Sequence, residues 1–163
     1  MTFRQALNDA AEKLKAADIM FCETPMLDAQ VLLAEAAEIT RERLFASYPD
    51  ELSIETENKF CNLIEKRLSG LPVSYIRNKK EFYGREFHVD ENVLVPRPDT
   101  EILIDRALQI LDSSKTLSDG AQSNTRILDL CTGSGCIAAT LKLERPQLEV
   151  FASDISKSAI QTA

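Results

Sequence analysis

Several features that define large classes of protein are missing from this sequence of 163 residues. No window holds ~18 consecutive apolar residues, which excludes a transmembrane helix of ordinary length and gives no reason to expect a membrane partner. The stretch from Met1 to Ala6 has no apolar core of the kind that a signal peptide needs. We therefore expect a cytoplasmic protein.

The usual ligands of a structural metal site are also scarce. The sequence has four cysteines, which form no Cys-x-x-Cys pair, and His88 is its one histidine. A structural zinc site needs four suitably spaced Cys or His ligands, so we expect no metal. Without a secretion signal, we expect the thiols to be reduced and mostly buried.

No excess of basic residues is present either. The 19 Lys and Arg residues are outnumbered by 26 Asp and Glu residues, which gives a net charge of −7. Nonspecific nucleic-acid binding needs the opposite balance, so we expect no direct nucleic-acid partner. We interpret the one basic cluster as a solvated loop; it consists of Arg77, Lys79, Lys80 and Arg85.

What the sequence does contain begins with helical patterns over residues 1–76. Apolar residues recur at three- and four-residue steps from Phe3 to Leu14. Pro25 can open a second helix, and Thr40 and Ser53 are suitable N-caps for two more. For the second helix we expect an apolar stripe of Leu27, Val31, Ala34 and Ala37. Short helices joined by short loops predict a small bundle with a structural or partner-binding role.

The apolar period changes to two between Glu81 and Val95. Phe82 and Phe87 fit two short strands around a turn at Gly84, so residues 77–95 are predicted to form a β-hairpin linker. Pro96-Arg97-Pro98 then stiffens the chain, and an acidic stretch opens the next helix. Ser113 to Asn124 has almost no apolar content and is predicted to be a flexible loop.

The last part of the chain alternates strand and helix. Residues 126–130 and 148–152 are predicted strands, with a helix from about Cys136 to Leu143 between them. This order of a strand, a glycine turn, a helix, a second strand and an acidic residue is typical of the first βαβ unit of a Rossmann-like sheet. The predicted fold class is therefore α+β, and residues 96–163 would form an incomplete domain.

The glycine turn suits the binding of a nucleotide-like ligand. Gly133 and Gly135 let the backbone approach a ligand and bend into the helix, whose first N–H groups point at that ligand. Asp154 lies 21 residues beyond Gly133, where a carboxylate can accept both ribose hydroxyl protons of an adenosine.

Two cofactors fit this arrangement, S-adenosylmethionine and a nicotinamide dinucleotide. Asp129 would repel the pyrophosphate of a dinucleotide but attract the sulfonium and ammonium groups of S-adenosylmethionine, so we favour the latter. The alternative role for Asp129 is that of a cap or turn residue.

Three stretches match the pattern of one family: Pro72–Ile76 as P-V-x-Y-I/L, Val93–Glu101 with the signature P-R-P-D-T-E, and Ile127–Ala138 as the cofactor loop D-L-G-T-G-S-G-x-I-A. On these residues the whole chain resembles the release-factor glutamine methyltransferases. The resemblance implies a Rossmann-like class I S-adenosylmethionine methyltransferase domain, preceded by a helical domain that recognises the substrate. One departure is Cys131, where many members have glycine; we expect it to have little effect.

The family implies methyl transfer from S-adenosylmethionine to the glutamine side-chain amide in the Gly-Gly-Gln motif of class I peptide-chain release factors. The modified proteins act in translation termination. A close relative modifies a ribosomal protein, but it usually has P-R-S-P-I where this chain has Pro96-Arg97-Pro98-Asp99-Thr100. By carry-over, Asp154 would hold the ribose, and Arg97 and Asp99 would lie near the cofactor pocket and contact substrate; the alternative for these two is a rigid turn plus helix capping. The residues lining the methionine end would be Cys131, Thr132, Gly133, Ser134 and Gly135, beside Asp129.

One element of the family is absent. Its Asn-Pro-Pro-Tyr loop presents the amide nitrogen to the methyl group, and no asparagine of this chain precedes a proline. We therefore expect no catalytic residue in this chain, which would be an inactive N-terminal fragment of a methyltransferase. The alternatives are a binding module or a fragment of a nicotinamide-dependent enzyme. A two-strand remnant should leave four residues partly exposed and open to self-association: Ile127, Leu128, Val150 and Phe151.

Overall fold

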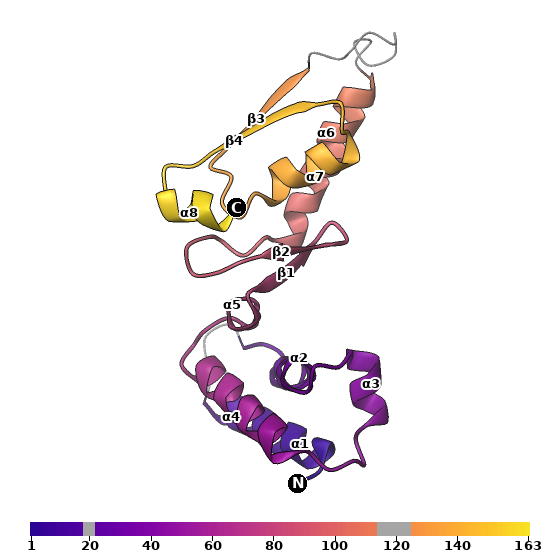
Figure 1. The fold of residues 1–163 in the computed structure, drawn as a ribbon, viewed down its shortest axis with the longest axis vertical. Helices are drawn as coiled ribbons and strands as arrows, with labels where there is room; N and C mark the ends of the chain where they lie inside the picture. Colours follow the sequence, from indigo (N-terminus) through magenta and orange to yellow (C-terminus); the bar gives the residue numbers. More distant parts are fainter. Residues whose placement is uncertain (18–21, 114–124) are drawn as a thin grey trace. The chain divides into compact units, whose positions relative to one another are not determined.

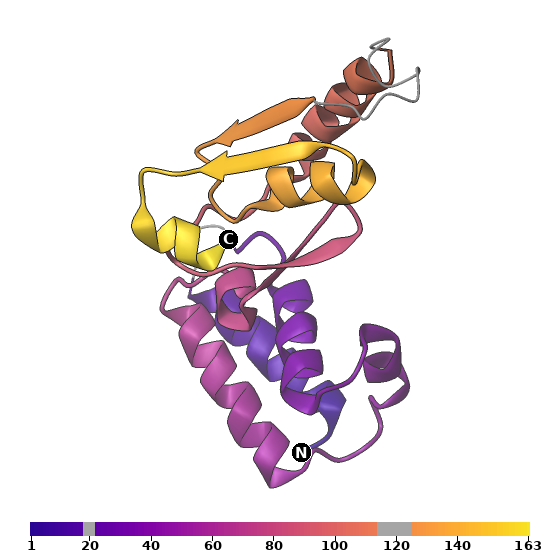
Figure 2. The same cartoon turned by 45° about the horizontal axis from the view of Figure 1, so that its top comes forward.

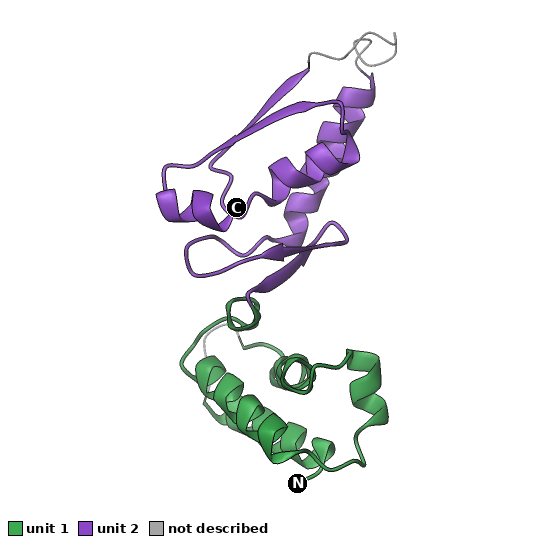
Figure 3. Cartoon of the chain, in the orientation of Figure 1, with its two compact units in different colours: residues 1–77 green, residues 78–163 purple. Residues whose placement is uncertain are grey.

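The computed structural model describes residues 1–17, 22–113 and 125–163. These residues form two compact units, 1–77 and 78–163, shown in different colours in Figure 3. The loop predicted from Ser113 to Asn124 lies outside the described residues, apart from Ser113 itself, which ends a helix.

The predicted three-part division, 1–76, 77–95 and 96–163, is close to this grouping at its first boundary. The hairpin, however, lies within the second compact unit. The finer division stays a prediction.

Among its described residues, the first unit has five helices: α1 (Phe3–Ala16), α2 (Pro25–Ala37), α3 (Arg41–Ala46), α4 (Ile54–Leu68) and α5 (Val73–Arg77) (Figure 1). The predicted caps are confirmed, because the Thr40 hydroxyl accepts from Arg43 N and the Ser53 hydroxyl accepts from Thr56 N. Thr2 and Gln5 form a capping box at the start of α1.

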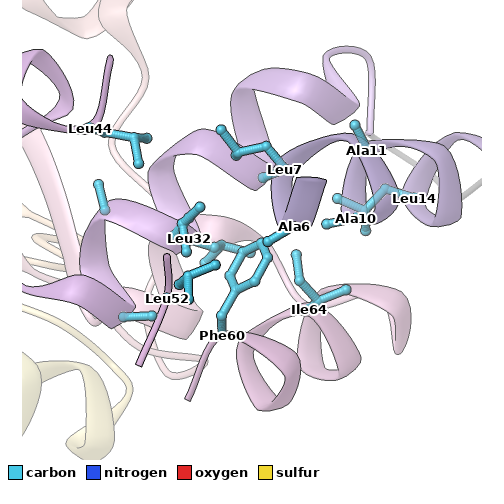
Figure 4. Close-up of a cluster of buried hydrophobic side chains, with 14 residues drawn as sticks. Ala6, Leu7, Ala10, Ala11, Leu14, Leu32, Leu44, Leu52, Phe60 and Ile64 are labelled. Atoms are coloured by element: carbon cyan, nitrogen blue, oxygen red, sulfur yellow. The ribbon is translucent and has the colours of Figure 1, made fainter. Parts of the chain in front are cut away.

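The core of the first unit lies between α1, α2 and α4. Leu14 of α1 and Leu32 of α2 are fully buried, and Phe60 of α4 is 3% exposed. Figure 4 shows these three helices contributing side chains to one cluster. Burial of this apolar surface is the main force that holds such short helices together.

The predicted apolar stripe of α2 is wrong at three of its four positions. Leu27 is 40% exposed, and Val31 and Ala37 are half-buried, so that only Ala34 belongs to the core. The helix is apolar on most of its sides and contacts α1, α3, α4 and α5. Periodicity alone cannot choose the buried face of such a helix. That face consists of Ala29, Leu32, Leu33, Ala34 and Ala36.

A buried ion pair joins α2 to α4, and no sequence pattern indicated it. Arg67 is 3% exposed; its Nε donates to Asp28 Oδ2 at 2.8 Å, and its Nη1 donates to the Leu71 carbonyl at 3.2 Å. A buried guanidinium is tolerated because these acceptors replace the water that it loses.

The second unit opens with an antiparallel hairpin of β1 (Lys79–Phe82) and β2 (Arg85–His88). Tyr83 and Gly84 have φ of 52° and 67°, as a two-residue hairpin turn requires, which confirms the turn predicted at Gly84. A single 3₁₀ turn, η1 (Pro98–Thr100), then leads into α6 (Glu101–Ser113).

The predicted βαβ unit is confirmed. Its elements are β3 (Arg126–Leu130), α7 (Cys136–Glu144) and β4 (Glu149–Ser153), followed by α8 (Lys157–Thr162). The strands pair in parallel, from Arg126 opposite Glu149 to Leu130 opposite Ser153. Figure 2 shows the two strands pointing the same way, with α7 along one side of them.

The two faces of this small sheet differ. Leu128 and Phe151, opposite each other in the register, are 57% and 42% exposed, whereas Ile127 and Val150 are half-buried. The partial exposure predicted for these four residues is therefore confirmed. Self-association through them stays a prediction.

The expectation that most cysteines are buried is wrong. All four thiols are free, but only Cys136 is buried; Cys22 is half-buried, and Cys61 and Cys131 are exposed. Cys61 is an exposed residue of α4, and Cys131 follows the end of β3, so neither is part of a core.

Cys131 also has an unusual backbone conformation. Its φ of 61° lies in the left-handed region, which costs an L-residue roughly 1–2 kcal/mol relative to glycine. The glycine that the cofactor-loop pattern has at this position suits the left-handed backbone and also leaves room for a ligand. We expected the cysteine to have little effect, but that expectation did not include the cost of this backbone conformation.

The ion pair between Asp28 and Arg67 leads to a prediction for stability. Asp28→Asn should lower the free energy of opening of α2 and α4 by about 3 kcal/mol, because it removes the carboxylate charge that faces the buried guanidinium at 2.8 Å. Amide hydrogen exchange in these two helices measures this loss. The double variant with Arg67→Met should regain much of it, whereas Glu38→Gln, in an exposed pair with Lys59, should change it by less than ~0.5 kcal/mol. Equal effects of Asp28→Asn and Glu38→Gln would contradict the prediction.

The left-handed backbone at Cys131 leads to a second prediction. Cys131→Gly should stabilise the second unit by about 1 kcal/mol, since the strain is relieved and only part of the gain is lost to the greater freedom of glycine in the unfolded chain. The control is Cys131→Ala, which removes the thiol but keeps the Cβ. Hydrogen exchange in β3 and α7 compares the two variants, and equal protection in both would show that the backbone is not strained here.

Candidate functional site

Two carboxylates lie at the carboxyl end of the parallel sheet. Asp129 is the fourth residue of β3, and Asp154 follows the last residue of β4. Because the strands are parallel and in register, their ends lie side by side. The backbone N–H of Thr132 extends the pairing by one step, donating to the Ser153 carbonyl at 3.0 Å. The sequence-predicted turn and the second acid are thus brought together.

Asp129 is buried and holds the turn from within. Its Oδ2 accepts from the Thr132 hydroxyl at 2.7 Å and from the Ala138 backbone N–H at 3.2 Å. Gly135, the N-cap of α7, has no side chain with which to cap the helix, and Asp129 supplies that acceptor from the strand. Its negative charge also suits the positive end of the helix dipole. The capping role considered as an alternative for Asp129 is therefore present in the structure.

Asp154 binds the turn from the other strand. Its Oδ2 accepts from the Gly133 N–H at 3.0 Å, and its Oδ1 accepts from the Ser156 N–H at 2.9 Å. The N–H groups of Ser156 and then Gly133 hold the pKa of Asp154 below its ordinary value, so the carboxylate is ionised at neutral pH. An ionised carboxylate has about four acceptor positions, and the backbone N–H of Ile155 also acts on this one, so at least one remains for a ligand at this half-exposed residue.

The two glycines of the turn serve different purposes. Gly133 has φ of 57°, and a Cβ built there would meet nothing within 4 Å, so its surface is open. Gly135 has φ of 73°, and its Cβ would lie 3.2 Å from the Ala163 Cβ. The first glycine leaves space beside the backbone, and the second allows close packing of α8.

The remaining predicted residues of the turn divide by exposure. Cys131 is exposed, whereas Thr132 and Ser134 are 5% and 6% exposed. A ligand on the outer surface of this turn would therefore meet the backbone of Thr132 and Ser134 more readily than their hydroxyl groups.

Arg97 and Asp99 stand apart from these contacts. Both side chains are exposed, and neither has a hydrogen-bond partner among the residues that the structure describes. From the same segment, sequence reasoning missed Glu101, whose Oε1 accepts from the Tyr83 N–H at 2.9 Å and so fixes the hairpin turn to α6. No periodicity marks such a contact, because it joins residues 18 positions apart.

The basic cluster is not the solvated loop that we expected, because its residues lie in α5, β1 and β2, and three of the four have acidic partners. Arg77 pairs with Glu35 at 2.8 Å, Arg85 pairs with Glu144 at 2.6 Å, and Lys79 lies 3.5 Å from Glu86. Within the described ranges, no three Cys, His, Asp or Glu residues are grouped as metal ligands would be. No helix in those ranges has both the length and the apolar character needed to cross a bilayer.

Comparison with known families agrees with the division into two units. Residues 5–77 match the PrmC N-terminal domain, and residues 103–163 match the methyltransferase small domain. The second match supports a Rossmann-like methyltransferase fold and does not support the nicotinamide alternative.

Individual relatives cover the whole chain. It is 40% identical to a release factor glutamine methyltransferase of Koribacter versatilis and 37% identical to one of Moorella thermoacetica, over 100% of this chain and 54% of each relative. A bifunctional methyltransferase of Rickettsia typhi is 40% identical over 99% of this chain and 33% of its own length. The chain thus spans about half the length of the curated release factor methyltransferases that it matches. With both of its units matched, the chain is similar over its whole length to release factor glutamine methyltransferases.

Proposed function

We propose that this chain provides the cofactor site and the substrate-recognition domain of an S-adenosylmethionine-dependent methyltransferase. The reaction methylates the glutamine side-chain amide in the Gly-Gly-Gln motif of class I release factors. One observation carries the proposal: the ionised Asp154 is bonded to the Gly133 backbone at the carboxyl end of β4, with acceptor capacity to spare.

The charges around the turn fit S-adenosylmethionine better than a dinucleotide. The Asp129 carboxylate accepts the hydrogen bond of the Ala138 N–H, in the first turn of α7. This donor is therefore not free for a pyrophosphate, which would need free N–H groups there. A phosphate there would meet a fixed negative charge, whereas a sulfonium or an ammonium group would be attracted. The donor and acceptor set of this turn therefore supports a cationic cofactor.

Each part of the cofactor has a counterpart among these residues. The free acceptor capacity of Asp154 suits the ribose hydroxyls. Ile155, next in the chain, is 99% exposed and offers an apolar surface to the adenine base. The open backbone at Gly133 and the exposed Cys131 suit the methionine end. When bound, S-adenosylmethionine supplies an electrophilic methyl group.

The chain's own residues account for binding and not for the transfer step. An amide nitrogen is a poor nucleophile, and the family's Asn-Pro-Pro-Tyr loop, which accepts its hydrogens and orients it, is absent from these 163 residues. We infer that this chain binds the cofactor without transferring the methyl group by itself.

For the protein substrate we propose the release factor rather than a ribosomal protein. The relatives are named for the release factor, and residues 96–100 have the sequence Pro-Arg-Pro-Asp-Thr rather than Pro-Arg-Ser-Pro-Ile. The first unit would recognise this partner. The exposed side chains of Arg97 and Asp99 are proposed to contact it near the cofactor.

The ribose contact predicts the effect of a single substitution. Asp154→Asn should weaken S-adenosylmethionine binding about 10-fold or more, because it removes the charge that strengthens these hydrogen bonds. Titration calorimetry of the chain measures the dissociation constant. The matched control is Glu149→Gln at the opposite end of β4, which should leave that constant unchanged. If both variants bind as the wild type does, Asp154 does not hold the ribose.

The lowered pKa of Asp154 gives this contact a definite pH dependence. Because the folded-state pKa is depressed, the carboxylate keeps its charge as the pH falls from neutral, and the charge is lost only as the pH falls through that lowered pKa. The ribose contact should therefore persist into weakly acidic solution.

The missing loop predicts the outcome of a transfer assay. Mixed with release factor and methyl-labelled S-adenosylmethionine, this chain should bind cofactor but leave the release factor unlabelled, and transfer by the chain alone would refute this.

The substrate can be tested in cells with the whole methyltransferase of which this chain would be a part. Loss of that enzyme should remove the mass of one methyl group from the Gly-Gly-Gln peptide of the release factor. A mass spectrum in which only a ribosomal protein loses that mass would point to the other substrate.

A further inference from the structure

The helix after Asp154, α8, packs against the rest of the second unit. Its N-cap is Ser156, whose hydroxyl accepts from the Ala159 N–H at 3.2 Å, and Ala159 is 3% exposed. These contacts fix the first turn of the helix beside Asp154.

The start of α8 is joined to the glycine turn through Asp154, and Ala163 packs against that turn directly. At its start, the Ser156 N–H donates to Asp154, whose other oxygen accepts from Gly133. At its end, Ala163 lies so close to Gly135 that an added Cβ would be 3.2 Å away. A shift of this helix would therefore move Asp154 and disturb the packing of the turn at two places.

The far end of α8 is bonded to the segment between the hairpin and η1 (Figure 1). The Thr162 hydroxyl lies 3.1 Å from each carboxylate oxygen of Asp90 and 3.1 Å from the Ser158 carbonyl. The hydroxyl has one proton to donate, and the charged carboxylate is the stronger acceptor. This contact joins residues 72 positions apart.

Asp90 is itself held firmly. Its two oxygens accept from the backbone N–H and the side-chain amide of Asn92, both at 3.0 Å. The residues on either side of this turn, Val89 and Val93, are 0% and 4% exposed. The Asn78 side-chain amide donates to the Val89 carbonyl, and the Asn78 carbonyl accepts from the Val89 N–H, so the turn is fixed to the start of the hairpin.

We propose that Asp90 and Thr162 are positioning residues of the cofactor site. Their hydrogen bond anchors the end of α8, and α8 in turn holds Asp154 at the distance from Gly133 that lets its remaining acceptor capacity face the ribose. Neither residue touches the ligand. The inference rests on the proposed function, because it assigns Asp154 to the ribose of S-adenosylmethionine.

The test compares two ligands on the full chain. Thr162→Val removes the hydroxyl but keeps the shape of the side chain, and it should weaken binding of S-adenosylhomocysteine about 3- to 10-fold. The 2′,3′-dideoxy analogue has no hydroxyls for Asp154 to bind, so its affinity should not change. Thr162→Ser, which restores the hydroxyl, should restore the affinity for S-adenosylhomocysteine. Equal weakening of both ligands, or of neither, would overturn the proposal.

Asp90→Asn should reproduce the effect of Thr162→Val, and the chain offers a matched control for it. Asp112 is also a carboxylate with both oxygens occupied, at 2.9 and 2.6 Å from the Arg145 guanidinium, but it makes no contact with α8 among the described residues. Asp112→Asn should leave both affinities unchanged. If it weakens S-adenosylhomocysteine as much as Asp90→Asn does, the effect is a general loss of stability and the proposal fails.

A measurement without ligand separates this proposal from the proposed function. In Thr162→Val the amides of Gly133 and Ser156, which donate to Asp154, should exchange about 3- to 10-fold faster, while those of the hairpin keep their rates. Unchanged exchange at Gly133 and Ser156 would refute the positioning role. If the wild-type chain binds no S-adenosylhomocysteine, the proposed function fails, and this exchange experiment alone decides whether Asp90 and Thr162 position Asp154.

Discussion

A single buried carboxylate organises the site of this chain. One oxygen of Asp129 accepts from the Thr132 hydroxyl and the Ala138 N–H, and so fixes both the turn after β3 and the first turn of α7. A helix that begins at a glycine has no cap of its own, and the strand provides one. The same charge sets the electrostatic character of the turn. The requirement for a cap and the preference for a cationic ligand therefore have one physical origin.

Backbone conformation explains which residues of the turn can vary. Cys131, Gly133 and Gly135 all have positive φ, so the glycine-rich pattern describes a chain path as much as a space for a ligand. Of the two glycines, only Gly135 also lacks room for a side chain, because Ala163 lies against it. A cysteine can stand at position 131 because its side chain is exposed to solvent, and its cost is confined to the backbone.

Features that depend on neighbours in the sequence were predictable, and features that depend on distant neighbours were not. The caps at Thr40 and Ser53 and the turn at Gly84 each depend on a few adjacent residues. The βαβ unit spans a longer stretch, but each of its strands and its helix has a local pattern of its own. The buried face of α2 depends on which helices surround it. The ion pair of Arg67, 39 residues from Asp28, depends on the packing of two helices, and a basic residue near a helix end looks like a solvated one until that packing is known.

The site shows the same division. The positions of Asp129 and Asp154 at two strand ends are predictable from spacing, but the partners of their oxygens are not. Asp154 belongs to a path that starts at the hairpin, passes through the Asp90 turn and Thr162, and reaches the carboxylate through α8. A residue at the end of a strand can orient a ligand only if the next segment of the chain is fixed, and here that support comes from a turn more than sixty residues earlier. The residues that hold α8 in place and the Asp154 carboxylate that faces the ligand are thus separate requirements, and only the carboxylate is marked by a motif in the sequence.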